Sequence, residues 1–113
     1  MADRLVLPDE GTPVTPRVAR DIIGDAFSVG ARTVVIPLGR LDPAFFDLRT
    51  GVAGDIVQAF VNYQLRLVVL GPLPPAATRS SSFSAFVAET NRGTQIWFVE
   101  TIEELDERLA ERG

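Results

Sequence analysis

The sequence predicts a single α/β domain of 113 residues, with about four mainly parallel strands that alternate with four helices. Short apolar runs rich in β-branched residues recur along the chain. Each run is followed by a segment whose apolar residues have helical spacing. No internal repeat or long linker interrupts this alternation, which favours a parallel sheet with helices packed on its faces.

The first strand and the first helix are both bounded by proline or glycine. Leu5–Leu7 is an apolar run that stops at Pro8, as expected of a short strand. A helix is expected from Thr15 as N-cap, with Pro16 in its first turn, to Gly30 as its stop. The residues at helical spacing are Val18, Ala19, Ile22, Ile23, Ala26, Phe27 and Val29.

The second strand and the second helix are separated by a turn. Thr33–Ile36 is expected to be a strand that is buried on both faces. Asp42–Pro43 predicts a short capped turn, and Thr50 is expected to cap the main second helix. Val57 and Val61 make its apolar stripe wider than one sheet face needs, so this helix is either deeply buried or shared with another subunit. The stripe itself contains Val52, Ile56, Ala59, Phe60 and Tyr63.

The last third of the chain repeats the pattern. Leu67–Gly71 predicts the most apolar strand, and the proline-rich residues 72–78 are expected to form a loop. A third helix is expected over about 80–91 and a last strand over 95–99. Thr101–Glu104 has the spacing of a capping box and predicts a final helix.

Composition excludes several classes of function. The sequence contains neither Cys, His nor Lys, which excludes thiol nucleophiles, Ser-His-Asp triads, Cys/His zinc sites and Schiff-base lysines. A net charge of −4 argues against nucleic acid as a partner, and the chain lacks an apolar run long enough to span a membrane. We therefore expect a cytoplasmic protein with no cofactor and no metal site. Residues 100–113 hold six acidic and two basic residues, which form either a tail for a basic partner or a solvated helix face.

A candidate site is expected where the strands end, because ligands of parallel sheets bind outside the carboxyl ends of the strands. The densest polar cluster there precedes the second helix. Backbone N–H groups and Arg49 suit a phosphate or carboxylate, although Asp47 and Thr50 also have a structural use as helix caps. Gly51 and Gly54 allow either a close approach by a ligand or partner, or tight packing within the domain. The candidate ligand or partner-binding residues are Asp47, Arg49, Thr50, Gly51, Gly54 and Gln58.

Two further groups of polar residues are candidates for modification or binding. Thr50 and the three serines Ser80, Ser81 and Ser82 are possible phosphorylation sites, and helix capping also explains the serines. A second candidate cluster is expected at the opposite edge of the sheet, where the same residues would also serve as C-terminal helix caps. This cluster contains Tyr63, Glu89, Asn91 and Arg92.

Several stretches resemble one bacterial family, domain of unknown function 4180. The most specific is FFDLRTGVAGDIVQ at residues 45–58, accompanied by Asn62-Tyr63, Leu67–Gly71 and ETNRG at residues 89–93. The resemblance spans roughly residues 15–110 and implies a small cytosolic bacterial α/β domain without an established activity. A looser resemblance is to STAS domains, in which Thr50 would take the place of the phosphorylated residue. It implies STAS-like layering, with flavodoxin-like layering as the other possibility.

Two functions follow from these residues. The first is a non-enzymatic regulatory or protein-interaction module that binds a protein partner, or itself as a homodimer, through the second helix and the loop before it. The second is a small-anion or phosphometabolite-binding protein, or a minor enzyme, that uses the Asp47–Gly51 turn. No catalytic motif is visible, so the sequence favours a protein that is not an enzyme.

Overall fold

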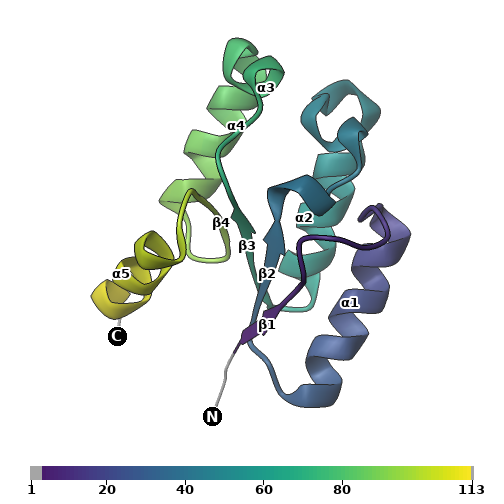
Figure 1. Ribbon diagram of the computed structural model, residues 1–113, viewed down its shortest axis with the longest axis vertical. Helices are drawn as coiled ribbons and strands as arrows, with labels where there is room; N and C mark the ends of the chain where they lie inside the picture. Colours follow the sequence, from purple (N-terminus) through teal and green to yellow (C-terminus); the bar gives the residue numbers. More distant parts are fainter. Residues whose placement is uncertain (1–3, 113) are drawn as a thin grey trace.

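The structure is a computed structural model that describes residues 4–112, and these form one four-stranded parallel sheet (Figure 1). The strands are β1 (Arg4–Val6), β2 (Thr33–Pro37), β3 (Arg66–Leu70) and β4 (Ile96–Val99). The predicted α/β class and parallel sheet are therefore confirmed. The strand order, which the sequence left open, is β1-β2-β3-β4, so each strand pairs with the next one along the chain.

This order decides where the helices lie. Right-handed crossovers that always step in the same direction place their helices on the same face of the sheet. That face is covered by α1 (Pro16–Val29), α2 (Val52–Asn62) and α4 (Ser81–Arg92), and a short helix α3 (Pro75–Arg79) precedes α4. The last helix, α5 (Ile102–Arg112), leads to no further strand and packs on the other face (Figure 1).

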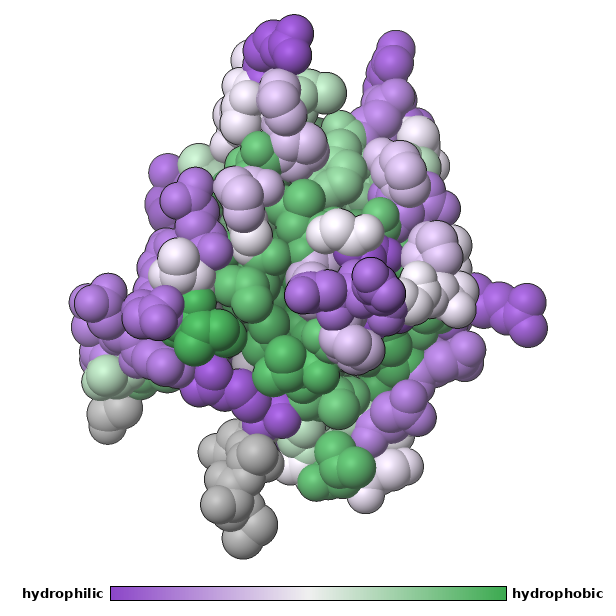
Figure 2. All heavy atoms as spheres, viewed as in Figure 1, coloured by the Kyte–Doolittle hydropathy of each residue, from purple (hydrophilic) through white to green (hydrophobic). Residues whose placement is uncertain are grey.

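The core is accordingly divided by the sheet. Figure 2 shows apolar side chains gathered over the middle of one face of the molecule, with mostly hydrophilic side chains around them. The larger part lies under α1, α2 and α4, where Val34, Ile36, Leu67, Val69, Ile96 and Phe98 of the strands meet the helices. The smaller part lies under α5, where Leu105 packs against Val35, Val68, Trp97 and Val99. Every second residue of a strand points to the same face, so the near-continuous apolar runs of β2, β3 and β4 supply both parts of the core.

Most of the predicted helix ends are confirmed. Thr15 accepts a hydrogen bond from the Val18 N–H, and Gly30 ends α1 in the left-handed conformation. Asp42 accepts from the Ala44 N–H and caps a 3₁₀ turn. At α5, Thr101 accepts from the Glu104 N–H, whereas the Glu104 side chain accepts from the Glu100 N–H. These ends depend on contacts within a few residues, which is why the sequence predicts them.

Two expectations were wrong. Residues 72–78 are not all loop, because α3 begins at Pro75, and a proline in the first turn of a helix loses no hydrogen bond. The end of the α1 stripe does not face the core: Phe27 is 54% exposed and Val29 is 65% exposed. The helix extends past the sheet at this end, so its last turn has no strand to cover.

A buried arginine organises the chain between β1 and α1. Arg40 is only 9% exposed, and its guanidinium donates hydrogen bonds to three backbone carbonyls, those of Pro8, Glu10 and Thr12. Gly11 lies against this group with φ +152°, and a Cβ atom there would come within 2.7 Å of the Arg40 Cζ. The guanidinium thus fixes the segment after β1 to the segment after β2.

We predict that Arg40→Met lowers the free energy of unfolding by about 2–3 kcal/mol, because it removes the charge-assisted hydrogen bonds from the guanidinium to three backbone carbonyls. Urea denaturation followed by circular dichroism measures the loss. Arg17→Met, at an exposed position of α1, is the matched control and should change stability by less than about 0.5 kcal/mol. Equal effects of the two substitutions would contradict the role assigned to Arg40.

Candidate functional site at the carboxyl edge of the sheet

Phenylalanine side chains bring the two long loops at the carboxyl edge together. Phe45 and Phe46 precede α2, Phe83 and Phe86 belong to α4, and Phe98 belongs to β4. Neighbouring rings in this cluster have centroids 5.5–6.2 Å apart, mostly edge to face. Such aromatic pairs stabilise the contact beyond the area they bury. The cluster therefore holds the Asp47–Gly51 turn beside the start of α4.

The Asp47–Gly51 turn is a 3₁₀ turn (Leu48–Thr50) that leads directly into α2. The Thr50 hydroxyl lies 2.8 Å from the carbonyl oxygens of both Ala44 and Asp47, and it accepts a hydrogen bond from the Val52 N–H. The residue before α2 is Gly51, with φ +81°, a conformation that side chains disfavour. Thr50 thus bonds to the start of α2 as expected, although Gly51 and not Thr50 is the N-cap.

Asp47 and Arg49 form an ion pair. Arg49 donates from Nε and Nη2 to the two carboxylate oxygens at 3.0 Å each, and its backbone N–H also donates to the carboxylate. The Arg49 side chain is 91% exposed. These side-chain and backbone hydrogen bonds lower the pKa of Asp47 below its ordinary value, and the same pair raises the pKa of Arg49. The cation expected to attract an anion is therefore neutralised by its neighbour.

A hollow joins this ion pair to the start of α4. Its volume is about 290 Å³, and it is lined by Phe46, Asp47, Leu48, Arg49, Ser80 and Ser82. Ser80 is the N-cap of α4: its hydroxyl accepts from the Phe83 N–H and lies 3.2 Å from the Ser82 hydroxyl. The structure thus places the first candidate cluster next to two of the three serines, while Ser81 is exposed at the start of the helix.

The remaining residues of the first cluster lie along α2. Gly54 is exposed, and a Cβ atom added there would have no neighbour within 4 Å. Tight packing within the domain therefore does not explain this glycine. Gln58 is also exposed, and its side-chain amide donates to Asn62 one turn later. Both residues lie on the outer surface of the helix, away from the Asp47–Arg49 ion pair.

The second candidate cluster does not come together. Tyr63 packs edge to face on Phe27 at the ends of α2 and α1, with ring centroids 6.0 Å apart. Glu89 and Arg92 form an exposed ion pair on α4. Asn91 has a different use: its amide donates to the Phe98 carbonyl and accepts from the Phe98 N–H. These two bonds cover the open edge of β4, a role that the sequence gave no sign of.

Glu89 of the second cluster lies on an open groove between α2 and α4. The groove has a volume of about 280 Å³. Its apolar part consists of Val57, Val61 and Ile96, and its rim is polar and includes Glu89 and Thr90. Val57 and Val61 are only partly buried. They contact the core with one side and leave the other side to the groove.

Two further observations limit the chemistry of the described residues. Among residues 4–112, no three His, Cys, Asp or Glu side chains are close enough together to hold a metal ion. Within the same residues, every helix is too short or too polar to cross a lipid bilayer.

The comparisons with known proteins identify a family and leave the chemistry open. The geometry defines a small α/β domain with a sequential parallel sheet. The chain belongs to the family described as domain of unknown function (DUF4180), whose model matches residues 3–109. Searches of the curated proteins and of the solved structures found no match. The resemblance seen in the sequence is therefore confirmed for the family, whereas the STAS-like topology is not.

We predict that Arg49→Gln raises the pKa of Asp47 toward its ordinary value, because it removes the guanidinium hydrogen bonds and charge that stabilise the carboxylate, while the backbone N–H of residue 49 still donates. In the wild type the lowered pKa means that the pair stabilises the fold above the unfolded pKa of Asp47. This contribution is lost as the pH falls through the lower, folded pKa.

An NMR titration of the Asp47 carboxyl carbon measures the shift. Arg17→Gln, on exposed α1, serves as the control and should leave the titration of Asp47 unchanged. An unchanged pKa of Asp47 in Arg49→Gln would contradict the ion pair.

Proposed function

We propose that this domain is a non-enzymatic interaction module of the bacterial cytoplasm that binds a protein partner through α2 and the groove beside α4. A second copy of the chain is the partner to test first. The observation that carries this proposal is the groove itself, where Val57 and Val61 are only partly buried between two helices. Apolar side chains at the centre of a polar rim are the arrangement found in protein interfaces.

The surface next to the groove supports the same proposal. Gly54 lies one turn before Val57 and Gln58, and a Cβ atom added there would meet no atom of another element within 4 Å. A glycine inside an exposed helix lowers the stability of that helix by about 1 kcal/mol relative to alanine. The presence of glycine at position 54 is explained if a partner's backbone approaches α2 closely at this point. The Gln58 amide offers a hydrogen-bonding group at the same rim.

Regulation of this surface would act through the turn before it. A phosphoryl group on Thr50 would add about −2 charge and remove the hydroxyl that contacts Ala44 and Asp47. The added charge would lie close to the Asp47 carboxylate and so compete for Arg49. Phosphorylation at Thr50 would therefore rearrange the start of α2, which is the helix proposed to bind the partner.

A second candidate function is the binding of a small anion, such as a phosphometabolite, in the hollow beside Arg49. The observation that favours it is that Arg49 lines the same hollow as Ser80 and Ser82 at the start of α4. An anion there would accept hydrogen bonds from hydroxyl and backbone N–H groups. It would also have to displace Asp47 from Arg49, which makes this candidate the weaker of the two.

For the first function we predict that the wild type self-associates and that Val57→Asp weakens the self-association at least about thirtyfold, because a buried unpaired carboxylate is costly in an interface. Sedimentation velocity over a range of concentrations measures it. Ser28→Asp places the same charge on exposed α1, outside the groove, and it should weaken self-association far less. A wild type that stays monomeric, or equal effects of both substitutions, would contradict self-association through this groove.

For the second function we predict that inorganic phosphate raises the Tm of the wild type by a few degrees in a saturable manner, because a ligand of the folded state stabilises it. Arg49→Gln should abolish the shift, and Arg17→Gln, on exposed α1, should preserve it. A shift that is linear in phosphate, or the same in all three proteins, would reflect a general salt effect and contradict a site beside Arg49.

A further inference from the structure

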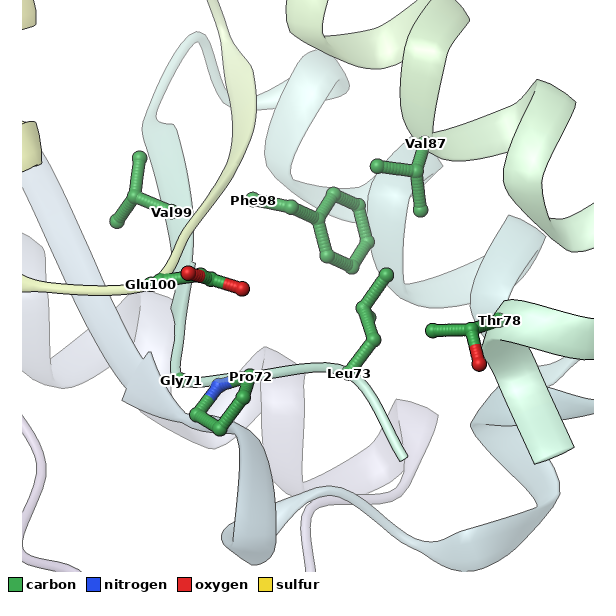
Figure 3. A pocket seen from close by; sticks show the side chains of 8 residues that line it. All are labelled: Gly71, Pro72, Leu73, Thr78, Val87, Phe98, Val99 and Glu100. Carbon is green, nitrogen blue, oxygen red and sulfur yellow. The ribbon is translucent and has the colours of Figure 1, made fainter. Parts of the chain in front are cut away.

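A separate cavity opens at the carboxyl ends of β3 and β4 (Figure 3). It has a volume of about 180 Å³ and lies outside both the groove and the hollow described above. Parallel sheets bind ligands at this edge. The lining residues are Gly71, Pro72, Leu73, Thr78, Val87, Phe98, Val99 and Glu100.

The walls of this cavity are apolar. Figure 3 shows Leu73, Val87 and Phe98 pointing into it from three different elements, namely the loop before α3, helix α4 and strand β4. Thr78 turns its methyl group toward the cavity, and its hydroxyl donates to the Pro75 carbonyl. Pro72 has no backbone N–H that could donate a hydrogen bond to a ligand. The walls therefore favour a hydrocarbon group.

A single charged group lies at the mouth. Glu100 follows β4 directly, and Figure 3 shows its carboxylate across the opening of the cavity. Within residues 4–112 this carboxylate takes part in none of the ion pairs, and the lining contains no arginine. Glu100 also begins the acidic stretch 100–113, so the field at the mouth attracts cations.

We propose that this cavity binds a small primary amine with a compact apolar body. The hydrocarbon part would occupy the space between Leu73, Val87 and Phe98, and the ammonium group would pair with Glu100. The size fits, because a cavity of about 150 Å³ with apolar walls accommodates benzene. The charge selects the class of ligand: a carboxylate would be repelled by Glu100, and a neutral alcohol would gain no ion pair.

The test uses three probes of similar shape and different charge: 2-phenylethylamine, 2-phenylethanol and 3-phenylpropionate. Binding is followed by NMR through the methyl signals of Leu73 and Val87. We expect saturable shifts with the amine, with a Kd on the order of 1 mM for a ligand of this size. The alcohol should bind about tenfold more weakly, and the carboxylate should not bind.

Matched variants separate the ion pair from the general charge of the protein. Glu100→Gln keeps the shape of the side chain and should weaken amine binding about tenfold, to the level of the alcohol. Glu103→Gln removes the same charge from exposed α5, outside the lining, and should leave the Kd unchanged. Thr78→Leu fills the cavity from α3 and should abolish binding of the amine and the alcohol alike.

Three results would overturn the proposal. The first is the absence of saturable shifts with the amine in the wild type, whose cavity is intact. The second is equal binding of the amine and the alcohol, and the third is equal effects of Glu100→Gln and Glu103→Gln, because either would assign no role to the Glu100 charge. The self-association test on Val57 is independent of all three results, because Val57 lies outside this cavity.

Discussion

The handedness of the connections between parallel strands constrains the whole structure. Four strands in sequential order require each crossover to step in the same direction, so α1, α2 and α4 must cover one face. Only α5, which comes after the last strand, remains for the other face. Because the order never reverses within residues 4–112, the described sheet has no switch point of the kind at which doubly wound folds bind nucleotides. The groove lies instead between α2 and α4, and the cavity lies at the carboxyl ends of β3 and β4.

The two edges of the sheet are protected by different means. At β4, Asn91 satisfies the N–H and carbonyl of Phe98 and so occupies the place of a neighbouring strand. At the other edge β1 is only three residues long, and Arg4 extends from it to Asp106 on α5. Short strands and charged side chains are common protections of an edge against pairing with another chain. Both features disfavour pairing of another chain with the sheet edges.

Local signals in the sequence predicted the helix caps, the strands and the α/β class, because each depends on residues close together in the chain. The contacts that the sequence did not predict join distant residues: Arg40 reaches carbonyls 28 to 32 positions away. The candidate site was predicted in part. The two loops do meet beside Arg49, but the neutralising bond from Arg49 to Asp47 requires side-chain geometry that spacing alone does not give. The residues of the second cluster do not lie together, because Tyr63 packs on Phe27 of α1 whereas Asn91 bonds to Phe98 of β4.

The chain contains one tryptophan, and its position gives the domain a built-in optical reporter. Trp97 is 1% exposed, and the guanidinium groups of Arg66 on β3 and Arg108 on α5 lie 4.6 and 4.2 Å from the centre of its ring. Arg108 also donates to the Asn91 carbonyl, so detachment of α5 would remove this cover and admit water to the indole. The intrinsic fluorescence of the domain therefore reports on the docking of its last helix. Because the indole Nε1 also donates a hydrogen bond to the Gly93 carbonyl, the same signal senses the end of α4 beside the groove.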